Sequence, residues 1–222
     1  MQSKRRRVYP GIQSPQLPAR LPSETLSVER LADQATFAQR TLTGGDLSDQ
    51  SAADALFEQV HLKRVSLART HLTTLQMLDA RCEVCDLAGA EWEKAHLSRI
   101  EWLGCRLTGL KLMESEIADA VIVDCNAEFM LCWSSVFKAV RFERCNLHAT
   151  SFHGADLSGV VFKDCDLSQA DLQGAKLVGA DLRGSTVDGL KVGVKEMQGA
   201  IIDPTQAALV ASLLGITVRW EE

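Results

Sequence analysis

Apolar residues, most of them large, occupy every fifth position from Leu42 to Val192, where the residue number ends in 2 or 7. The positions two residues earlier hold mostly Ala, Val, Cys, Ser, Thr or Leu. A period of five matches neither the 3.6-residue period of an α-helix nor the two-residue period of a β-strand. The pattern therefore predicts short extended segments, each with two inward residues, separated by a corner every five residues.

Glycine and proline support this interpretation. Eleven of the fifteen glycines lie two residues after a large apolar position, where a corner favours a residue that accepts unusual backbone angles. Proline is absent from residue 23 to residue 203, as expected if the N–H groups of this stretch donate to neighbouring strands.

The cysteines indicate how many corners close one coil. Five of the seven recur at intervals of twenty residues, namely Cys85, Cys105, Cys125, Cys145 and Cys165. Twenty residues are four units of five, which predicts a four-sided coil whose corners stack in register, as in a solenoid. A metal site would need thiols that converge on one point. Thiols in a row along an axis are more typical of small buried apolar residues, so we expect no metal and no cofactor.

Three segments read Ala-Asp-Leu-x-Gly, at residues 155–159, 170–174 and 180–184. They match the A-(D/N)-L-x-x unit of the pentapeptide-repeat family, which the chain resembles in phase over residues 35–202. The resemblance implies an all-β fold, a right-handed quadrilateral parallel β-helix of about eight coils. We expect a basic, proline-rich N-terminal arm at residues 1–34, the β-helix at 35–202, and a helix–strand cap at 203–222.

The cap begins with a legible helix start. Asp203 supplies an N-cap, Pro204 takes the first helical position, and Gln206 completes a capping box. An apolar helix to residue 214 and a final strand over residues 216–220 follow. The helix is apolar nearly all round, and the ending resembles the module through which quinolone-resistance members of the family form dimers. The candidate contacts of such a homodimer are Leu209, Leu213, Leu214 and Trp220.

The coil at residues 120–139 breaks the size pattern. Its inward positions include the small Ala127 and Cys132, while large apolar residues fall at outward positions. Such residues, if exposed together, form a partner-binding surface. Alternatively, the coil bulges so that Phe129 turns inward, or the proline-rich arm lies across this face. The candidate patch consists of Met113, Val121, Val123, Phe129, Leu131 and Trp133.

The charge is unevenly distributed along the chain. Residues 1–30 carry six Lys/Arg and two Asp/Glu, so the remainder carries 18 against 27, a net charge of −9. Some pentapeptide-repeat proteins mimic DNA and occupy the DNA-binding surface of DNA gyrase, and a carboxylate stripe would attract that surface. Here Lys and Arg residues interrupt the acidic ones, so an ordinary mixed-charge surface is the competing interpretation. The candidate acidic face consists of Asp156, Asp166, Asp171 and Asp181.

No catalytic or cofactor-binding motif occurs, and the five histidines are spread over several coils and faces, with His148 and His153 nearest to each other. We therefore expect a non-catalytic scaffold that binds an unidentified protein partner. The alternative is a DNA-mimicking modulator or protector of DNA gyrase or another topoisomerase, and a metal-binding or catalytic solenoid comes third. Unpaired cysteines indicate the cytoplasm. Neither membrane insertion nor sequence-specific DNA binding is expected.

Overall fold

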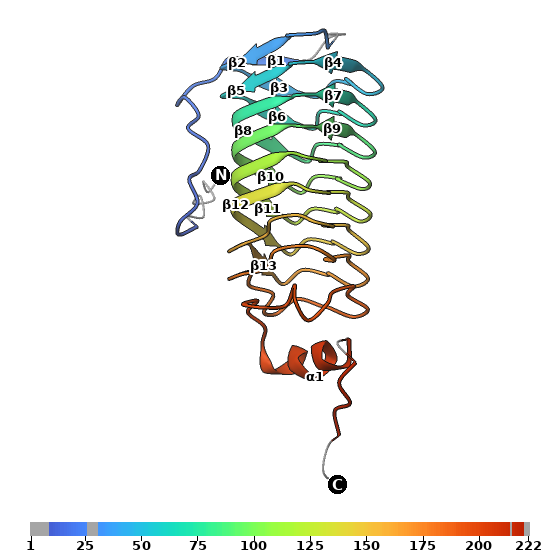
Figure 1. Ribbon diagram of the computed structural model, residues 1–222. Coiled ribbons are helices and arrows are strands. Elements are labelled where there is room, and N and C mark those ends of the chain that lie inside the picture. The colour runs from blue at the N-terminus through green and yellow to red at the C-terminus, as the bar shows by residue number, and fades with distance from the viewer. Residues whose placement is uncertain (1–8, 26–30, 214, 220–222) are drawn as a thin grey trace.

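The chain forms a parallel β-solenoid in which each coil takes twenty residues (Figure 1). The computed structural model describes residues 9–25, 31–213 and 215–219. Residues 76, 81, 86 and 91 begin the four sides of one coil, and each is bridged to the residue twenty positions later. The column from Asp46 to Thr186 holds eight stacked residues, so the coil makes about seven turns between them. The predicted four-sided β-solenoid is confirmed.

We number the faces of the rod in chain order around one coil. The first face carries β2 (Thr36–Ala38) and β5 (Leu56–Glu58), and the second carries β1 (Ser23–Thr25), β3 (Thr41–Thr43), β6 (His61–Lys63) and β13 (Val161–Lys163). Four longer strands run from the first face around the corner onto the second: β8 (Gln76–Glu83), β10 (His96–Leu103), β11 (Glu116–Val123) and β12 (Val136–Glu143). The third face contains the column from Asp46 to Thr186. The fourth carries β4 (Ser51–Ala53), β7 (His71–Thr73) and β9 (Glu91–Glu93).

The inward residues of the five-residue pattern fill the rod from end to end. Phe142 and Phe162 are buried in consecutive coils and stack with their ring centroids 5.3 Å apart. Trp92 is also buried, and its Nε1 donates to Thr70 Oγ1 at 3.0 Å, so its polar atom is satisfied inside the core. Because each coil packs mainly on the coils before and after it, stacking supplies the hydrophobic stabilisation.

The corners take a left-handed backbone conformation whichever residue occupies them. Gly104 has a φ of 61°, while Val84 and Phe129 at equivalent corners have φ values of 55° and 59°. This conformation costs little for glycine and more for a β-branched or bulky residue. The glycine signal in the sequence is therefore a preference of the corner, and the fold tolerates other residues there.

The cysteine ladder lies in the core, and all seven cysteines are free and buried. The Sγ of Cys125 lies 3.5 Å from the carbonyl oxygen of Trp102, twenty-three residues earlier. The hydroxyl of Ser185, in the same column, donates to the equivalent carbonyl at 3.1 Å. Hydrogen bonds with the Cys105 and Cys145 thiols, together with burial, raise the pKa of Cys125. The Cys125 thiol thus stays protonated, and the buried cysteines of the column serve as compact core residues.

The C-terminal end of the rod is closed by α1 (Pro204–Leu213). The predicted capping box is present: Asp203 Oδ1 accepts from the Gln206 N–H at 3.0 Å, and Gln206 Oε1 accepts from the Asp203 N–H at 2.9 Å. The buried Gln206 also donates from Nε2 to the carbonyl oxygens of Leu182 and Ser185, both at 2.7 Å. One side chain therefore starts the helix and satisfies two carbonyls of the last coil.

The predicted final strand is wrong for residues 216–219, which form no strand and are exposed. After Gly215, whose φ of 78° ends the helix, the chain leaves the rod (Figure 1). Ile216 and Val218 favour an extended conformation, but no strand edge of the described rod lies beside them to accept their hydrogen bonds.

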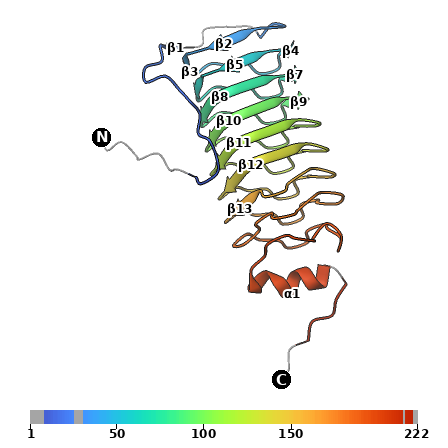
Figure 2. The same cartoon turned by 60° about the vertical axis from the view of Figure 1, so that its left-hand side comes forward.

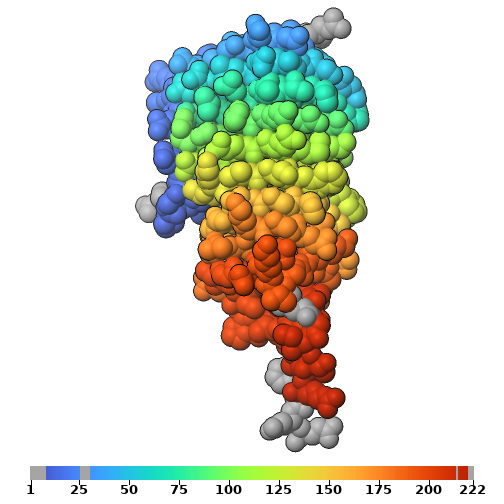
Figure 3. Space-filling view, viewed as in Figure 1, coloured from blue at the N-terminus to red at the C-terminus, as the bar shows by residue number. Residues whose placement is uncertain are grey.

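The described part of the N-terminal arm, residues 9–22, runs along the outside of the rod and leads into β1 (Figures 1 and 2). The space-filling view shows it as a ridge along one edge of the upper coils (Figure 3). The Pro22 carbonyl accepts from Thr41 at the first coils, and Tyr9 lies over Arg141, which belongs to β12. The arm therefore spans five coil-to-coil steps.

Candidate interaction surfaces

The candidate patch does not form one surface, because its members lie on opposite sides of the rod. Val121 and Leu131 are ten residues apart, which is half a coil, so they occupy the second and fourth faces. Val121 and Val123 are only 5% and 7% exposed although they point outward. They lie on β11, beside the strand whose Arg141 contacts the arm. The arm passes close to Val121, because Gln13 donates to Asp119 and Tyr9 contacts Arg141, the strand partner of Val121.

The other side of the same coil is open. Phe129 is 52% exposed and Trp133 is 46% exposed, so Phe129 does not turn inward. Leu131, on the same face, and Met113, one coil before Trp133, are half-buried. We call these four residues the aromatic corner, because Phe129 occupies the corner where the third face meets the fourth.

Two contacts fix the rings of the aromatic corner. Trp133 Nε1 donates to Ser151 Oγ at 2.9 Å, one coil further along the rod. The Phe129 ring meets His148 edge-to-face, with ring centroids 6.2 Å apart. The aromatic side chains therefore stand on the surface in defined orientations, and a partner would lose little conformational entropy in ordering them.

The arm is held at the corner between the first and second faces by hydrogen bonds to its backbone. The Gln16 N–H donates to Asp79 Oδ1 at 2.8 Å, and the Gln13 N–H donates to Asp119 Oδ1 at 2.9 Å. Gln59 Nε2 in turn donates to the Gln16 carbonyl at 3.2 Å. Pro15, between the two donors, is buried. This arm-binding column of Gln59, Asp79, Arg99 and Asp119 was not apparent in the sequence.

Asp79 also forms an ion pair within the rod, in addition to its hydrogen bond with the arm. It is 6% exposed, and Arg99 in the next coil donates to it from Nε at 2.6 Å and from Nη2 at 2.8 Å. Burial alone would raise the pKa of Asp79, but these bonds and the Gln16 N–H hold it below its usual value. The carboxylate is therefore charged and fixed in orientation at neutral pH.

The candidate acidic face is dispersed over the whole circumference. Asp156 lies on the first face, Asp181 on the second, Asp166 on the third and Asp171 on the fourth. Each accepts the backbone N–H two residues later, at 2.9–3.1 Å. The Asp of the repeat unit thus stabilises the turn that follows it.

Several exposed carboxylates are neutralised along the rod axis. Stacking places residues twenty apart side by side, and an acidic residue in one coil pairs with a basic residue in the next. Such pairs are Asp49–Arg69, Asp86–Arg106, Glu91–Lys111 and Asp124–Arg144. In these columns a basic residue therefore neutralises the acidic one, although the sequence suggested an acidic body.

Comparison with known proteins agrees with this geometry. The profile described as pentapeptide repeat region matches residues 95–172, and the profile described as pentapeptide repeats matches residues 165–186. Together with the twenty-residue register of the strands, these matches decide the family. The chain belongs to the pentapeptide-repeat family.

Two solved pentapeptide-repeat structures illustrate the likeness. HetL, from the cyanobacterium Nostoc sp. and involved in heterocyst differentiation regulation, is 20% identical, with 77% of this chain and 90% of HetL covered and a TM-score of 0.47. Full-length QnrB1, a plasmid-mediated fluoroquinolone resistance protein, is 17% identical, with 89% of this chain and 99% of QnrB1 covered and a TM-score of 0.40. No curated protein matches the chain. At this level of similarity, neither structure carries an argument about function.

The candidate dimer contacts of this pentapeptide-repeat protein are only partly described. Leu209 and Leu213 are half-buried against the core of their own rod. Leu214 and Trp220 lie outside the described residues. The apolar residues exposed beside α1 are instead Ile216 and Val218, at 57% and 39%. Much of the helix therefore caps its own solenoid, which explains a large part of its apolar character.

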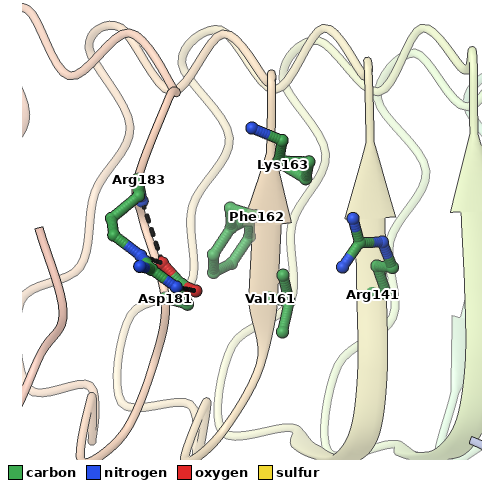
Figure 4. A pocket seen from close by; sticks show the side chains of 6 residues that line it. All are labelled: Arg141, Val161, Phe162, Lys163, Asp181 and Arg183. Carbon is green, nitrogen blue, oxygen red and sulfur yellow. Dashed lines mark hydrogen bonds and ion pairs between the residues drawn. The ribbon is translucent and has the colours of Figure 1, made fainter. Parts of the chain in front are cut away.

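A shallow groove of about 340 Å³ lies on the second face, between β12 and the coil that follows β13 (Figure 4). The Arg183 guanidinium pairs with Asp181 at 2.7 Å, and the Lys163 ammonium lies 3.1 Å from Asp164. Because these cations already have carboxylate partners, the groove is not a preformed anion site. It is lined by Arg141, Val161, Phe162, Lys163, Asp181 and Arg183.

Among the described residues, no group of three or more His, Cys, Asp or Glu side chains is arranged to hold a metal ion. His71 pairs with Glu91, and His148 contacts Ser168, each within its own column. No helix in the described segments is long and apolar enough to cross a membrane.

Proposed function

We propose that this pentapeptide-repeat protein is a non-catalytic scaffold that binds another protein through the aromatic corner. The observation that carries the proposal is the exposure of Phe129 and Trp133, at 52% and 46%, in fixed orientations beside Leu131. Oriented aromatic side chains with an apolar neighbour are typical of the anchors of protein interfaces. A rod without a deep cavity in its described part suits this role better than it suits catalysis.

The expected partner presents an apolar surface able to enclose an indole ring. Trp133 Nε1 already donates to Ser151, so the partner gains little from a hydrogen bond to it and most from burying its faces. The nearby charges are paired within the rod, as with Glu91 and Lys111 or Lys94 and Glu114. Binding should therefore depend weakly on salt.

The test is capture of partners from a lysate of the native cell with matched variants. Trp133→Ala and Phe129→Asn each remove one aromatic anchor. Val84→Asn is the control, because Val84 is 64% exposed at a different corner with the same backbone conformation. We expect a protein that the wild type and Val84→Asn retain and that both anchor variants lose. Equal retention by all four proteins would contradict the proposal.

The same charge pattern gives no support to the DNA-mimicking alternative. A mimic of duplex DNA needs carboxylates in uninterrupted rows, whereas an Arg follows and pairs with the acidic residue in several columns of this rod. A supercoiling assay with DNA gyrase at low salt and excess protein separates the two functions. We expect no inhibition and no protection from quinolones, and either effect would favour the mimic.

Dimerisation through the C-terminal cap is a separate proposal. The exposed Ile216 and Val218 beside α1 support it, while the packing of Leu209 and Leu213 on their own rod reduces the free apolar surface. Light scattering over a range of concentrations tests it, and a concentration-independent monomer would remove it.

A further inference from the structure

The hydrogen bonds that hold the N-terminal arm have a regular spacing on both sides. On the arm, the donors Gln13 and Gln16 are three residues apart; on the rod, the acceptors Asp119 and Asp79 are forty residues, or two coils, apart. Two coils at the usual strand separation measure about 9.6 Å. Three residues of a polyproline II helix advance about 9.3 Å, which is one full turn. One turn of polyproline II therefore matches two coils of this rod.

The arm's sequence suits that conformation. Pro15 and Pro18 repeat at the same three-residue interval, and each restricts its own φ and the residue before it to the extended region. Residues 12–18 form no helix, strand or turn. Neither donor residue is a proline, so the N–H groups of Gln13 and Gln16 remain available to bind the rod.

The hydrogen bonds at Gln13 and Gln16 join the rod to the arm's backbone, while Tyr9, further along the arm, contacts Arg141 through its ring. Asp79 and Asp119 accept backbone N–H groups, and Gln59 donates to a backbone carbonyl. Arg99, between the two aspartates in the column, fixes the orientation of Asp79. Such contacts select a conformation and a spacing of free N–H groups, and another polyproline II segment can make them equally well.

We propose that the arm-binding column is a recognition site for polyproline II segments, which the chain's own arm occupies in cis and from which a proline-rich segment of another protein displaces it. The site lies at the corner between the first and second faces, far around the rod from the aromatic corner, and does not depend on the function proposed there. Displacement would also free the corner beside β11, where the arm is bound to Asp119.

The probe for the test is a fluorescent peptide with the sequence of residues 9–22, whose binding to full-length protein is followed by anisotropy. In the wild type the tethered arm competes at an effective concentration of about a millimolar, so the peptide should bind weakly. The double variant Gln13→Pro/Gln16→Pro removes both N–H donors from the arm while favouring the same backbone conformation. We expect it to bind the peptide at least about tenfold more tightly than the wild type does.

Two controls make the result specific. Adding Asp79→Ala and Asp119→Ala to the double variant should abolish peptide binding, whereas adding Asp49→Ala, which breaks an ion pair of the same geometry at another corner, should not. Trypsin cleavage after the exposed Arg20 reports whether the arm is released in each variant.

The proposal is overturned if the arm is released but the peptide fails to bind, or if loss of both aspartates leaves binding unchanged. The wild type could instead form dimers as its concentration rises, and Gln13→Pro/Gln16→Pro could abolish them. That result would overturn the assignment to another protein, because the arm of a second copy would then be the ligand.

Discussion

The two sides of the coil at residues 120–139 follow the same repeat, but their outward residues differ in solvent exposure. On the second face, Val121 and Val123 are almost fully buried although they point outward. On the fourth face, half a coil further, Leu131 is partly exposed and Trp133 is 46% exposed. The difference arises outside the repeat, because the N-terminal arm runs along one side of the rod only (Figures 1 and 2).

This comparison separates two kinds of information in a repeat protein. The five-residue pattern determines which residues enter the core, and every coil obeys it. It leaves the outward residues free, and their environment depends on what else packs on the rod. Function is accordingly to be sought among outward residues that depart from the polar norm.

The largest expected effect comes from placing a charge on each side. Val121→Asp buries a carboxylate beneath the covered face and should lower the free energy of unfolding by about 3 kcal/mol. Leu131→Asp, on the open face, should change it by less than about 0.5 kcal/mol. Urea unfolding followed by tryptophan fluorescence measures both. Equal losses would mean that the two sides do not differ in burial.

A second matched pair compares two carboxylates that bind an arginine one coil away. Asp79→Ala leaves Arg99 and the Gln16 N–H without their partner under the arm, so we expect a loss of about 2 kcal/mol and faster trypsin cleavage at Arg20. Asp49→Ala breaks an exposed pair with Arg69, so no measurable loss of stability is expected and cleavage should be unchanged. Arm release in both variants would argue against a specific role for Asp79.

Acid should weaken the covered side selectively. The folded-state pKa of Asp79 lies below its usual value of 3.8, because the hydrogen bonds from Arg99 and Gln16 outweigh the effect of burial. Its contribution is therefore complete above pH 3.8 and is lost as the pH falls through the lower folded-state pKa. The Gln16 amide resonance should titrate with a midpoint below 3.8. A midpoint above this value would contradict the hydrogen bond to an ionised Asp79.

The smallest expected effect is at the aromatic corner itself. Phe129→Asn exchanges a large apolar residue for one that tolerates the positive φ of 59° at this corner. The contact with His148 is lost and backbone strain is relieved, so the free energy of unfolding should change by less than about 0.5 kcal/mol. Thermal unfolding tests this. A large destabilisation would indicate that Phe129 is retained for folding rather than for binding.

The sequence predicted the fold well because the core is periodic. The twenty-residue cysteine column already implied four faces, and Asp203 and Gln206 form the capping box that their spacing indicated. The prediction of a final strand was wrong because Ile216 and Val218 have strand propensity but no neighbouring strand in the described rod.

The surfaces were predicted less well, partly for an avoidable reason. Residues stack in one column only if their numbers agree modulo twenty, and a shift of five moves a residue to the next face. This rule places Val121 opposite Leu131 and distributes the four aspartates over four faces. The arm-binding column could not be predicted from the repeat. It depends on Gln13 meeting a carboxylate 106 residues away, and no periodicity in the sequence encodes that contact.

The most direct test of the contrast is photocrosslinking in the native cell from two positions of the rod. A photoreactive amino acid in place of Leu131 reports on the open face, and one in place of Arg141, which lies 5.4 Å from the Tyr9 ring, reports on the covered face. We expect position 131 to link to another protein and position 141 to link to residues of the chain's own arm. Adducts of the same kind from both positions, or an arm adduct from position 131, would contradict the account.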